Sequence, residues 1–525
     1  MLAALVVAVA MAVPLAYIVV RAAGGDPETW RRLVSREVPA LLASTVALVV
    51  LTTSGALVVG TGLAWLVERT DLPGVRWLRP LAAVPLAIPP YAGAICYLQL
   101  LRPSGAIDAA LEGTPFAGWP LPRPFGLAGA SVVLVLFTYP YVYLLVAAAL
   151  RDTNRVWDDL ARVAGHGRRG LLRHVTLPLL RPALGAAAVL VSLYALSDYG
   201  AVALTRYRTF SYAVFQQVQG QVDRSGAAAL SGVLVLMTLA VIAFEARVGR
   251  EGRYAQRTPG WRPARPVPLG RWRLPALGFV GAVLGLAVGV PFVVLGAWAL
   301  SNAFAPPDAT AAWLMPAGRV AGAALNTLWT SAAAASLGVL AALPVAYLVV
   351  RHPGSPSSAL MALSQSGYAM PGVVMALSLV ALFNRGLPAL YGTVGVVVAA
   401  YTARFLPQAI QALRTGFEGL APSLGDAGRT LGLGPWAVLR RIDLPLMLPG
   451  LTAGWSLVFL SSLKELPATL ILRPPGFDTL PTAIWTSASE AVYRAAALPA
   501  LVLIVVALVP LAVLLRRGEL GTGSL

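Results

Sequence analysis

Residues 159–182, DLARVAGHGRRGLLRHVTLPLLRP, and residues 426–449, DAGRTLGLGPWAVLRRIDLPLMLP, are two ungapped copies of one polar stretch, 267 positions apart. The identical positions are Asp159/Asp426, Arg162/Arg429, Gly165/Gly432, Gly167/Gly434, Leu172/Leu439, Arg173/Arg440, Leu177/Leu444, Pro178/Pro445, Leu179/Leu446 and Pro182/Pro449. In each copy an acid starts, a glycine interrupts and a Leu-Pro pair ends two short amphipathic helices. Glycine permits backbone conformations that other residues resist, so the pattern predicts a rigid, helix-turn-helix-like corner, made twice.

The rest of this 525-residue chain is strongly apolar. It is 58% hydrophobic and only 12% charged, whereas soluble domains carry about 25% charged residues. A membrane-spanning helix needs about 20 apolar residues, and the sequence predicts twelve. Their approximate ranges are 2–20, 43–66, 81–101, 126–150, 182–204, 228–246, 274–299, 322–350, 359–383, 389–413, 449–471 and 496–515. The sequence therefore predicts an all-α polytopic membrane protein.

The positive charge is concentrated in a few loops. The net charge is +18, and Lys464 is the one lysine among forty basic residues. Residues 151–181 hold seven arginines and residues 247–273 hold eight. Basic loops prefer the cytoplasmic side of a membrane, so we expect both polar copies and the N-terminus in the cytoplasm, and no nucleic-acid partner. An exception is the arginine group that this topology places outside after the first span, comprising Arg21, Arg31, Arg32 and Arg36.

The chain divides into two halves of six predicted spans. Ahead of the polar copies, a second register of 282 residues pairs several short motifs. It matches Ser44-Thr45 with Asn326-Thr327, Trp65-Leu66 with Tyr347-Leu348, Arg69 with Arg351, and Pro89 with Pro371. An even number of spans gives both halves the same orientation, as in parallel repeats. We expect a first half over 1–248, a cytoplasmic linker over 249–273 and a second half over 274–525.

Cysteine, histidine and proline usage adds three expectations. The single cysteine, Cys96, lies within a span, so neither a disulfide nor a cysteine metal site is expected. The three histidines lie at or near cytoplasmic loops, and neither metal ligands nor catalytic residues are predicted. Prolines remove a helical hydrogen bond, so we expect kinks in the third and ninth spans at Pro85, Pro89, Pro90 and Pro371.

The twin stretches resemble the EAA loop of binding-protein-dependent ABC importer permeases. Each has an acid-x-x-Arg-x-x-Gly run, then nine residues, then a branched aliphatic residue, x and Leu-Pro. Both copies depart from the Glu-Ala-Ala opening, with Asp159-Leu160-Ala161 and Asp426-Ala427-Gly428. The resemblance covers essentially the whole chain as two fused permease halves. It implies a type I ABC importer fold of two parallel six-helix repeats.

In that family the loop forms the coupling helices that fit into grooves of two ATPase subunits. The resemblance therefore implies ATPase contacts, through Asp159, Arg162, Gly165, Leu177, Pro178, Asp426, Arg429, Gly432, Leu444 and Pro445. A P-loop needs Gly-Lys-Ser/Thr, but Lys464 is followed by Glu465. ATP and magnesium are therefore expected on a separate ATPase, with no cofactor in this non-enzymatic chain. The family also implies a periplasmic or lipid-anchored solute-binding protein and a place in the bacterial inner or plasma membrane.

Charged residues within the fifth and eleventh spans suggest a translocation pathway. The 267 register pairs Asp198 with Glu465, and also Arg206 with Arg473 and Phe210 with Phe477. Ionisable residues in spans are functional-site hypotheses, and we expect the two acids to face each other across the pseudo-twofold axis. The candidate gate comprises Asp198, Arg206, Lys464, Glu465 and Arg473. The alternative is structural, with Lys464 and Glu465 paired locally and the arginines reaching outward.

Residues 462–485, SLKELPATLILRPPGFDTLPTAIW, resemble the permeases of ferric-iron importers, which are often single chains with two fused halves. That resemblance implies ferric iron as the solute. Two alternatives stay open. One is the same architecture serving thiamine, sulfate, polyamine or phosphonate import. The other is a secondary transporter of six plus six spans, driven by an ion gradient.

Overall fold

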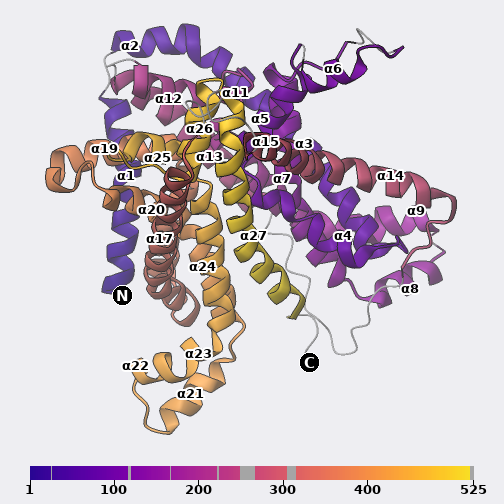
Figure 1. The fold of residues 1–525 in the computed structure, drawn as a ribbon. Helices are drawn as coiled ribbons and strands as arrows, with labels where there is room; N and C mark the ends of the chain where they lie inside the picture. Colours follow the sequence, from indigo (N-terminus) through magenta and orange to yellow (C-terminus); the bar gives the residue numbers. More distant parts are fainter. Residues whose placement is uncertain are drawn as a thin grey trace.

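The computed structural model describes residues 1–24, 27–103, 105–115, 120–165, 167–220, 224–248, 266–303 and 315–520 (Figure 1). Within these ranges the chain is helical and contains no β-strand, apart from an isolated bridge between Thr70 and Val267. The all-α fold class is therefore confirmed. Residues 249–265 of the predicted linker, 249–273, lie outside the described residues.

Helices of the first half alternate between long apolar segments and short connecting pieces. They are α1 (Leu2–Ala23), α2 (Pro27–Arg32), α3 (Val38–Arg69), α4 (Val75–Leu81), α5 (Pro90–Leu101), α6 (Ala106–Leu111), α7 (Gly126–Arg151), α8 (Arg155–Val163), α9 (Arg168–Leu171), α10 (Leu177–Ser197), α11 (Gly200–Leu204), α12 (Phe210–Gly220) and α13 (Arg224–Val248).

The second half repeats this order. It comprises α14 (Arg273–Leu284), α15 (Val290–Ala303), α17 (Ala317–Arg351), α18 (Ser355–Ser364), α19 (Gly372–Gly386), α20 (Val394–Glu418), α21 (Pro422–Thr430), α22 (Pro435–Val438), α23 (Leu444–Leu446), α24 (Leu448–Leu463), α25 (Pro467–Leu472), α26 (Leu480–Ser489) and α27 (Ala497–Leu520). In Figure 1, α8 and α9 lie at the right and α21–α23 project at the bottom, whereas α2, α11, α12 and α26 lie at the top. We call the top of this view the outer end.

Eight of the described helical segments are long and apolar enough to cross a membrane, and the number rises to eleven if three sharply bent pairs each count as one span. The remaining predicted span, 389–413, corresponds to α20, a 25-residue helix that contains Arg404. The N-terminal end of α1 points toward the end of the molecule from which α21–α23 project (Figure 1). This direction agrees with the expected orientation of the first span.

The third span of each half is broken at a proline. Residues 75–101 bend by 94° and residues 355–386 bend by 106°. Pro89 and Pro371 sit at the two breaks in extended backbone conformations, and a short helix begins directly after each. The predicted kinks are confirmed at these matched prolines. Because a proline cannot donate the helical hydrogen bond, the same break forms in both halves.

The first helix of each half packs against the other half. Helix α1 packs on α17, α18 and α19, and α15 packs on α5. Ser366 Oγ donates to the backbone oxygen of Met11 (2.8 Å), and Tyr97 OH donates to that of Leu286 (2.6 Å). The two halves are therefore joined by exchanged helices as well as by the linker. The boundaries proposed from sequence, 1–248 and 274–525, stay a prediction.

A polar pair on α3 holds the loop before α12. Ser44 Oγ donates to the backbone oxygen of Arg208 (2.7 Å). Thr45 Oγ1 accepts a hydrogen bond from the backbone N–H of Phe210 (3.1 Å). Both contacts join residues more than 160 positions apart, so they fix the outer end of α3 to the start of α12.

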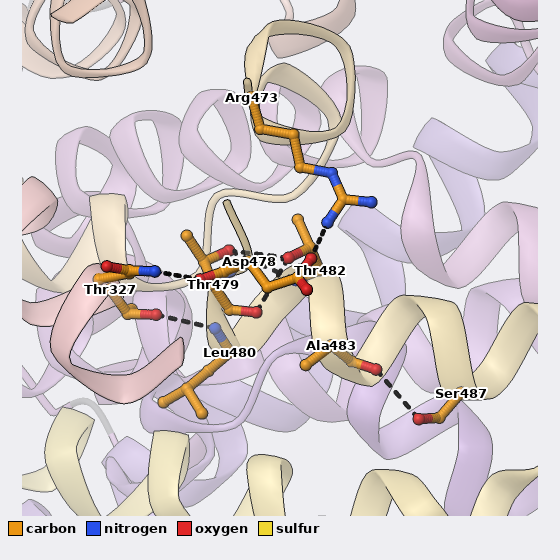
Figure 2. Close-up of polar contacts among 9 residues, drawn as sticks. Thr327, Arg473, Asp478, Thr479, Leu480, Thr482, Ala483 and Ser487 are labelled. Carbon is orange, nitrogen blue, oxygen red and sulfur yellow. Dashed lines mark hydrogen bonds and ion pairs between the residues drawn. The ribbon is translucent and has the colours of Figure 1, made fainter. Parts of the chain in front are cut away.

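The matched pair on α17 holds α26 in the same way. Asn326 Nδ2 donates to the backbone oxygen of Asp478 (2.9 Å). Thr327 Oγ1 accepts from the backbone N–H of Leu480 (2.8 Å), as Figure 2 shows. Thr479 and Thr482 cap the start of α26 reciprocally. The Ser-Thr and Asn-Thr motifs that revealed the repeat therefore make equivalent contacts.

These contacts also correct one predicted match. They align Phe210 with Leu480, 270 positions apart, so the prediction that Phe210 matches Phe477 is wrong. The loop after Arg473 is three residues longer than the loop after Arg206. Gly476 accommodates the extra turn with a φ of 76°, a conformation that costs glycine little.

Replacing Thr327 with valine is expected to destabilise the fold. The change keeps the side chain's size but leaves the buried N–H of Leu480 without its acceptor, which costs about 1–3 kcal/mol. Thr327→Ser keeps the hydroxyl and serves as the matched control. Thermal unfolding of the detergent-purified chain measures the effect, and equal midpoints for the valine and serine variants would contradict this account.

Candidate functional site

The two polar copies form two corners of the same design. We call residues 155–178 the first corner and residues 422–445 the second corner. Their helices begin at the same register of 267 residues: α8 with α21, α9 with α22, and α10 with α23. In each corner a short π-helical turn links the second helix to the next element, over Leu172–Thr176 and Leu439–Asp443. The predicted repetition of structure is thus confirmed.

A left-handed glycine separates the two short helices of each corner. Gly165 has a φ of 79° and Gly432 a φ of 81°. In the second corner, Gly432 N–H donates to Arg429 O (2.9 Å) and Leu433 N–H donates to Gly428 O (3.1 Å). These bonds close the end of α21 in the manner of a glycine helix cap. The predicted glycine break is confirmed in both copies.

The first helix of each corner begins earlier than predicted. Helices α8 and α21 start four residues before Asp159 and Asp426, so the prediction that these acids begin the helices is wrong. The start signals are Asn154, whose Oδ1 accepts from the backbone N–H of Val156 (3.2 Å), and Pro422 in the first turn. Asparagine before a helix and proline in its first turn both favour helix initiation.

The acid and arginine of the family pattern lie on the exposed side of the second corner. Asp426 pairs with Arg429 at 3.5 Å, and both side chains are more than half exposed. In the first corner, Asp159 and Arg162 hold the same helical positions, and the side chain of Arg162 lies outside the described part. An exposed ion pair contributes little to stability, so this pair leaves the surface polar without fixing the corner.

The prediction that a Leu-Pro pair ends the second helix of each corner is wrong. Leu177 and Pro178 begin α10, and Leu172–Ser197 forms one continuous span. Leu444 and Pro445 begin α23, after which the chain bends by 72° into α24. Proline fits the first turn of a helix because its missing N–H has no partner there. Each corner is therefore connected directly to a spanning helix.

Large apolar side chains are exposed on both corners. In the first corner Trp157, Leu160 and Val163 are exposed, and Val163 is 88% exposed. In the second corner Leu431 is 83% exposed and Trp436 is 71% exposed. Exposed apolar groups gathered between charged residues are typical of protein interaction sites. The sequence reasoning did not single out these exposed apolar residues.

A buried ion pair ties the second corner to α17. Arg351 Nη2 lies 3.4 Å from Asp443 Oδ1, and both side chains are largely buried. The matching positions in the first half are Arg69 and Thr176. There the end of the linker pairs with the end of α3, through a hydrogen bond from Val267 N–H to Arg69 O (2.7 Å). Because Thr176 stands where the second half has Asp443, the first half has no acid at this position to form the equivalent ion pair.

A cavity of about 160 Å³ lies where the two halves meet. Its wall contains six pairs of residues related by the 267 register. These are Tyr141/Gln408, Tyr194/Ser461, Ser197/Lys464, Asp198/Glu465, Tyr199/Leu466 and Gly200/Pro467. Since both members of each pair line one space, this central cavity lies on the pseudo-twofold axis of the chain. Asp198, Lys464 and Glu465 of the predicted pathway are brought together here.

The two acids cap equivalent helices. Asp198 Oδ1 accepts hydrogen bonds from the backbone N–H groups of Ala201 (3.0 Å) and Val202 (3.2 Å), at the start of α11. Glu465 Oε1 accepts from the N–H of Ala468 (3.1 Å), at the start of α25. A carboxylate is favourable at a helix N-terminus. The fifth and eleventh predicted spans are therefore interrupted at the acids, which stabilise the breaks.

Two basic residues of the second half, Arg404 and Lys464, make polar contacts with the first half at the central cavity. Arg404 forms an ion pair with Glu465, and its Nη2 donates to Ser197 Oγ of the first half (3.3 Å). Lys464 Nζ donates to the backbone oxygen of Leu86 in the first half (2.6 Å). The predicted local pairing of Lys464 with Glu465 is wrong, because Glu465 pairs with Arg404 and Lys464 reaches the other half.

Arg404 is a residue of the central cavity that the sequence reasoning missed. It is the only charged residue in the predicted span 389–413, and a lone charge in a span is costly unless it is paired. Gly372 makes room for the pair, because a Cβ there would lie 2.1 Å from Arg404 Nη1 and 2.6 Å from Glu465 Oε1. The sequence signal that could have revealed Arg404 is its position as a lone charge in an apolar span.

Arg206 and Arg473 lie away from the central cavity. Arg206 lines a separate cavity of about 790 Å³, and its guanidinium stacks over Phe125 at 5.2 Å. Arg473 pairs with Asp478 (Figure 2). Neither arginine lines the central cavity, because the chain turns outward after α11 and after α25, so their place in the pathway stays a prediction. The larger space, which we call the outer cavity, lies at the outer end among α12, α26 and their loops.

Comparison with known proteins identifies the family. The model of the family described as "Binding-protein-dependent transport system inner membrane component" matches residues 56–248 and 334–517. The chain belongs to this family. The two matched regions contain the two corners and both walls of the central cavity. This permease therefore carries two copies of the family's domain in a single chain.

Several relatives resemble the permease over most of its length. It is 29% identical to Fe(3+)-transport system permease protein FbpB 2 of Haemophilus influenzae, over 95% of this chain and 94% of the relative. It is 26% identical to the probable ABC transporter permease protein y4fN of Sinorhizobium fredii, over 93% and 89%. A putative 2-aminoethylphosphonate transport system permease protein, PhnV of Salmonella typhimurium, is 30% identical over 22% of this chain and 44% of the relative.

Proposed function

We propose that this permease is the membrane subunit of an ATP-driven importer of ferric iron. The observation that carries the proposal is the likeness to a Fe(3+)-transport permease along 95% of the chain. The phosphonate permease matches only 22% of it. Family membership also disfavours a secondary transporter, since transport in this family depends on a binding protein.

Two copies of a separate ATPase would bind the two corners. The exposed apolar side chains of α8, α21 and α22 would fill grooves on the ATPase, as an amphipathic helix does in a partner's groove. ATP and magnesium would be bound by that subunit, and this chain would hold no cofactor. A periplasmic or lipid-anchored solute-binding protein would dock at the outer end and release its solute into the outer cavity.

The corners are placed to transmit movement to the pathway. Helix α10 runs from the first corner to Asp198 without a break, about 30 Å at 1.5 Å per residue. Helix α24 runs from the second corner to Lys464, about 24 Å by the same rise. Closure of an ATPase dimer would draw the corners together and rotate both helices about the central cavity. This rigid movement of the two repeats would open the central cavity to each side of the membrane in turn, which is alternating access.

Uptake by proteoliposomes tests the solute. Vesicles would contain this chain, its partner ATPase and its binding protein, the last loaded in turn with ferric iron, thiamine, sulfate, a polyamine or 2-aminoethylphosphonate. We expect accumulation of iron that requires both ATP and the binding protein. Accumulation of another solute in place of iron would retain the importer and overturn the iron assignment.

A further inference from the structure

Three aromatic rings separate the outer cavity from the central cavity. Tyr199 lines both spaces. Its ring centroid lies 3.9 Å from that of Phe215 and 5.0 Å from that of Trp485, and both of these residues line the outer cavity. Tyr199 and Phe215 are almost completely buried. The rings therefore fill the connection between the two spaces with apolar material.

The rings come from both halves at related positions. Phe215 on α12 and Trp485 on α26 are 270 positions apart, the register fixed by the contacts of Thr45 and Thr327. The cluster thus lies near the pseudo-twofold axis, above the central cavity. Tyr199 follows Asp198 directly, at the point where α10 ends. Because Tyr199 stacks on Phe215 and both belong to the first half, movement of α26 away from the first half would separate Trp485 from Tyr199.

Close packing continues beneath Tyr199. A Cβ on Gly200 would lie 2.8 Å from Tyr91 Cβ and 3.1 Å from Leu466 Cδ2. Leu466 is the mate of Tyr199 in the second half and is also buried. A hydrated ion would have to lose its water to pass between such apolar groups, which is strongly unfavourable.

We propose that Tyr199, Phe215 and Trp485 form the outer gate of the permease, closed in this structure. The proposal rests on the proposed function, in which solute passes from the outer cavity to the central cavity. It assigns the barrier to apolar rings, whereas the charged residues Asp198, Lys464 and Glu465 form the wall of the chamber behind it. The gate opens when the two halves move apart at the contact between Tyr199 and Trp485.

Cysteine accessibility tests the gate directly. The parent variant carries Cys96→Ala, which removes the single native thiol, and Ser461→Cys, which places a thiol in the wall of the central cavity. It would be studied in right-side-out membrane vesicles without ATP, with a sulfonated, membrane-impermeant maleimide added outside. Ser489→Cys, at an exposed position that lines the outer cavity, gives the rate for an open position.

We expect the thiol at position 461 to react at least tenfold more slowly than the thiol at position 489. Adding Tyr199→Ala or Trp485→Ala should raise the rate at position 461 at least tenfold, whereas Tyr199→Phe, which keeps the ring, should not. Trp455→Ala is the matched control, because it removes a ring stacked on Phe459 within α24 that lines neither cavity. Trp485→Leu provides a milder change if an alanine variant fails to fold, as judged by gel filtration.

Fast labelling of the parent, or slow labelling in every folded ring variant, would overturn the gate. Labelling needs neither ATP nor solute, so its result is independent of whether the chain imports iron. Failure of iron uptake with the expected labelling pattern would reject the solute and retain the gate. Normal uptake with the opposite labelling pattern would reject the gate alone.

Discussion

Replacement of Gly432 or Gly165 by proline is expected to abolish ATP-coupled uptake while leaving the chain inserted in the membrane. Proline fixes φ near −65°, whereas these glycines have φ values of 81° and 79°. The two short helices of a corner then cannot meet at the observed angle. Because the corners lie outside the apolar core, the spanning helices should still assemble. Uptake per inserted protein in vesicles with the partner ATPase measures the loss, which we expect to exceed about tenfold, equivalent to about 1.4 kcal/mol.

Two milder changes make this prediction specific. No atom lies within 4 Å of a Cβ built on Gly432, so Gly432→Ala meets only backbone strain of about 1–2 kcal/mol and should lose part of the activity. Gly434, with a φ of −67°, needs no glycine, and Gly434→Ala should behave as the natural chain does. Normal coupled uptake by both proline variants would contradict the assignment of the corners as coupling elements.

Breaking the ion pair between Arg404 and Glu465 is expected to destabilise the central cavity strongly. Both side chains are largely buried, and loss of one partner from such a pair costs about 3–5 kcal/mol because the other charge is left uncompensated. Glu465→Gln keeps an acceptor for the N–H of Ala468 but leaves Arg404 unpaired. Arg404→Met leaves Glu465 unpaired. Thermal unfolding of the purified chain should show a large drop in midpoint for either variant.

The double variant separates charge balance from a direct role in transport. Arg404→Met with Glu465→Gln removes both charges, so it should recover most of the lost stability. If the pair only supports the helix break, uptake per folded protein returns as well. The exposed pair Arg414–Glu418 is the matched control and should contribute no more than about 1 kcal/mol. Single variants at 404 and 465 as stable as the natural chain would contradict the structural role assigned here.

The repeat itself could be read from the sequence because it rests on local rules. A glycine with positive φ, a proline in the first turn of a helix and a proline at a break each act within a few residues. The corners at Gly165 and Gly432 and the broken spans at Pro89 and Pro371 were therefore predictable. The helix starts were missed because Asn154 was not weighed against Asp159, five residues later, nor Pro422 against Asp426, four residues later.

Contacts between distant segments were harder to predict. The sequence placed Lys464 and Glu465 together as neighbours, yet their partners are Leu86 and Arg404, far away along the chain. The aromatic cluster of Tyr199, Phe215 and Trp485 depends on the register of 270, which only the contacts of Thr45 and Thr327 reveal. A three-residue insertion after Arg473 hid that register. The exchange of α1 and α15 between the halves leaves no local pattern at all.

The most direct test of the account measures what drives transport. Proteoliposomes containing this chain would be supplied with the transported solute and its binding protein, with or without the partner ATPase, and with ATP or an imposed ion gradient. The account predicts accumulation only when the ATPase and hydrolysable ATP are both present. Accumulation by the chain alone on an ion gradient would contradict it.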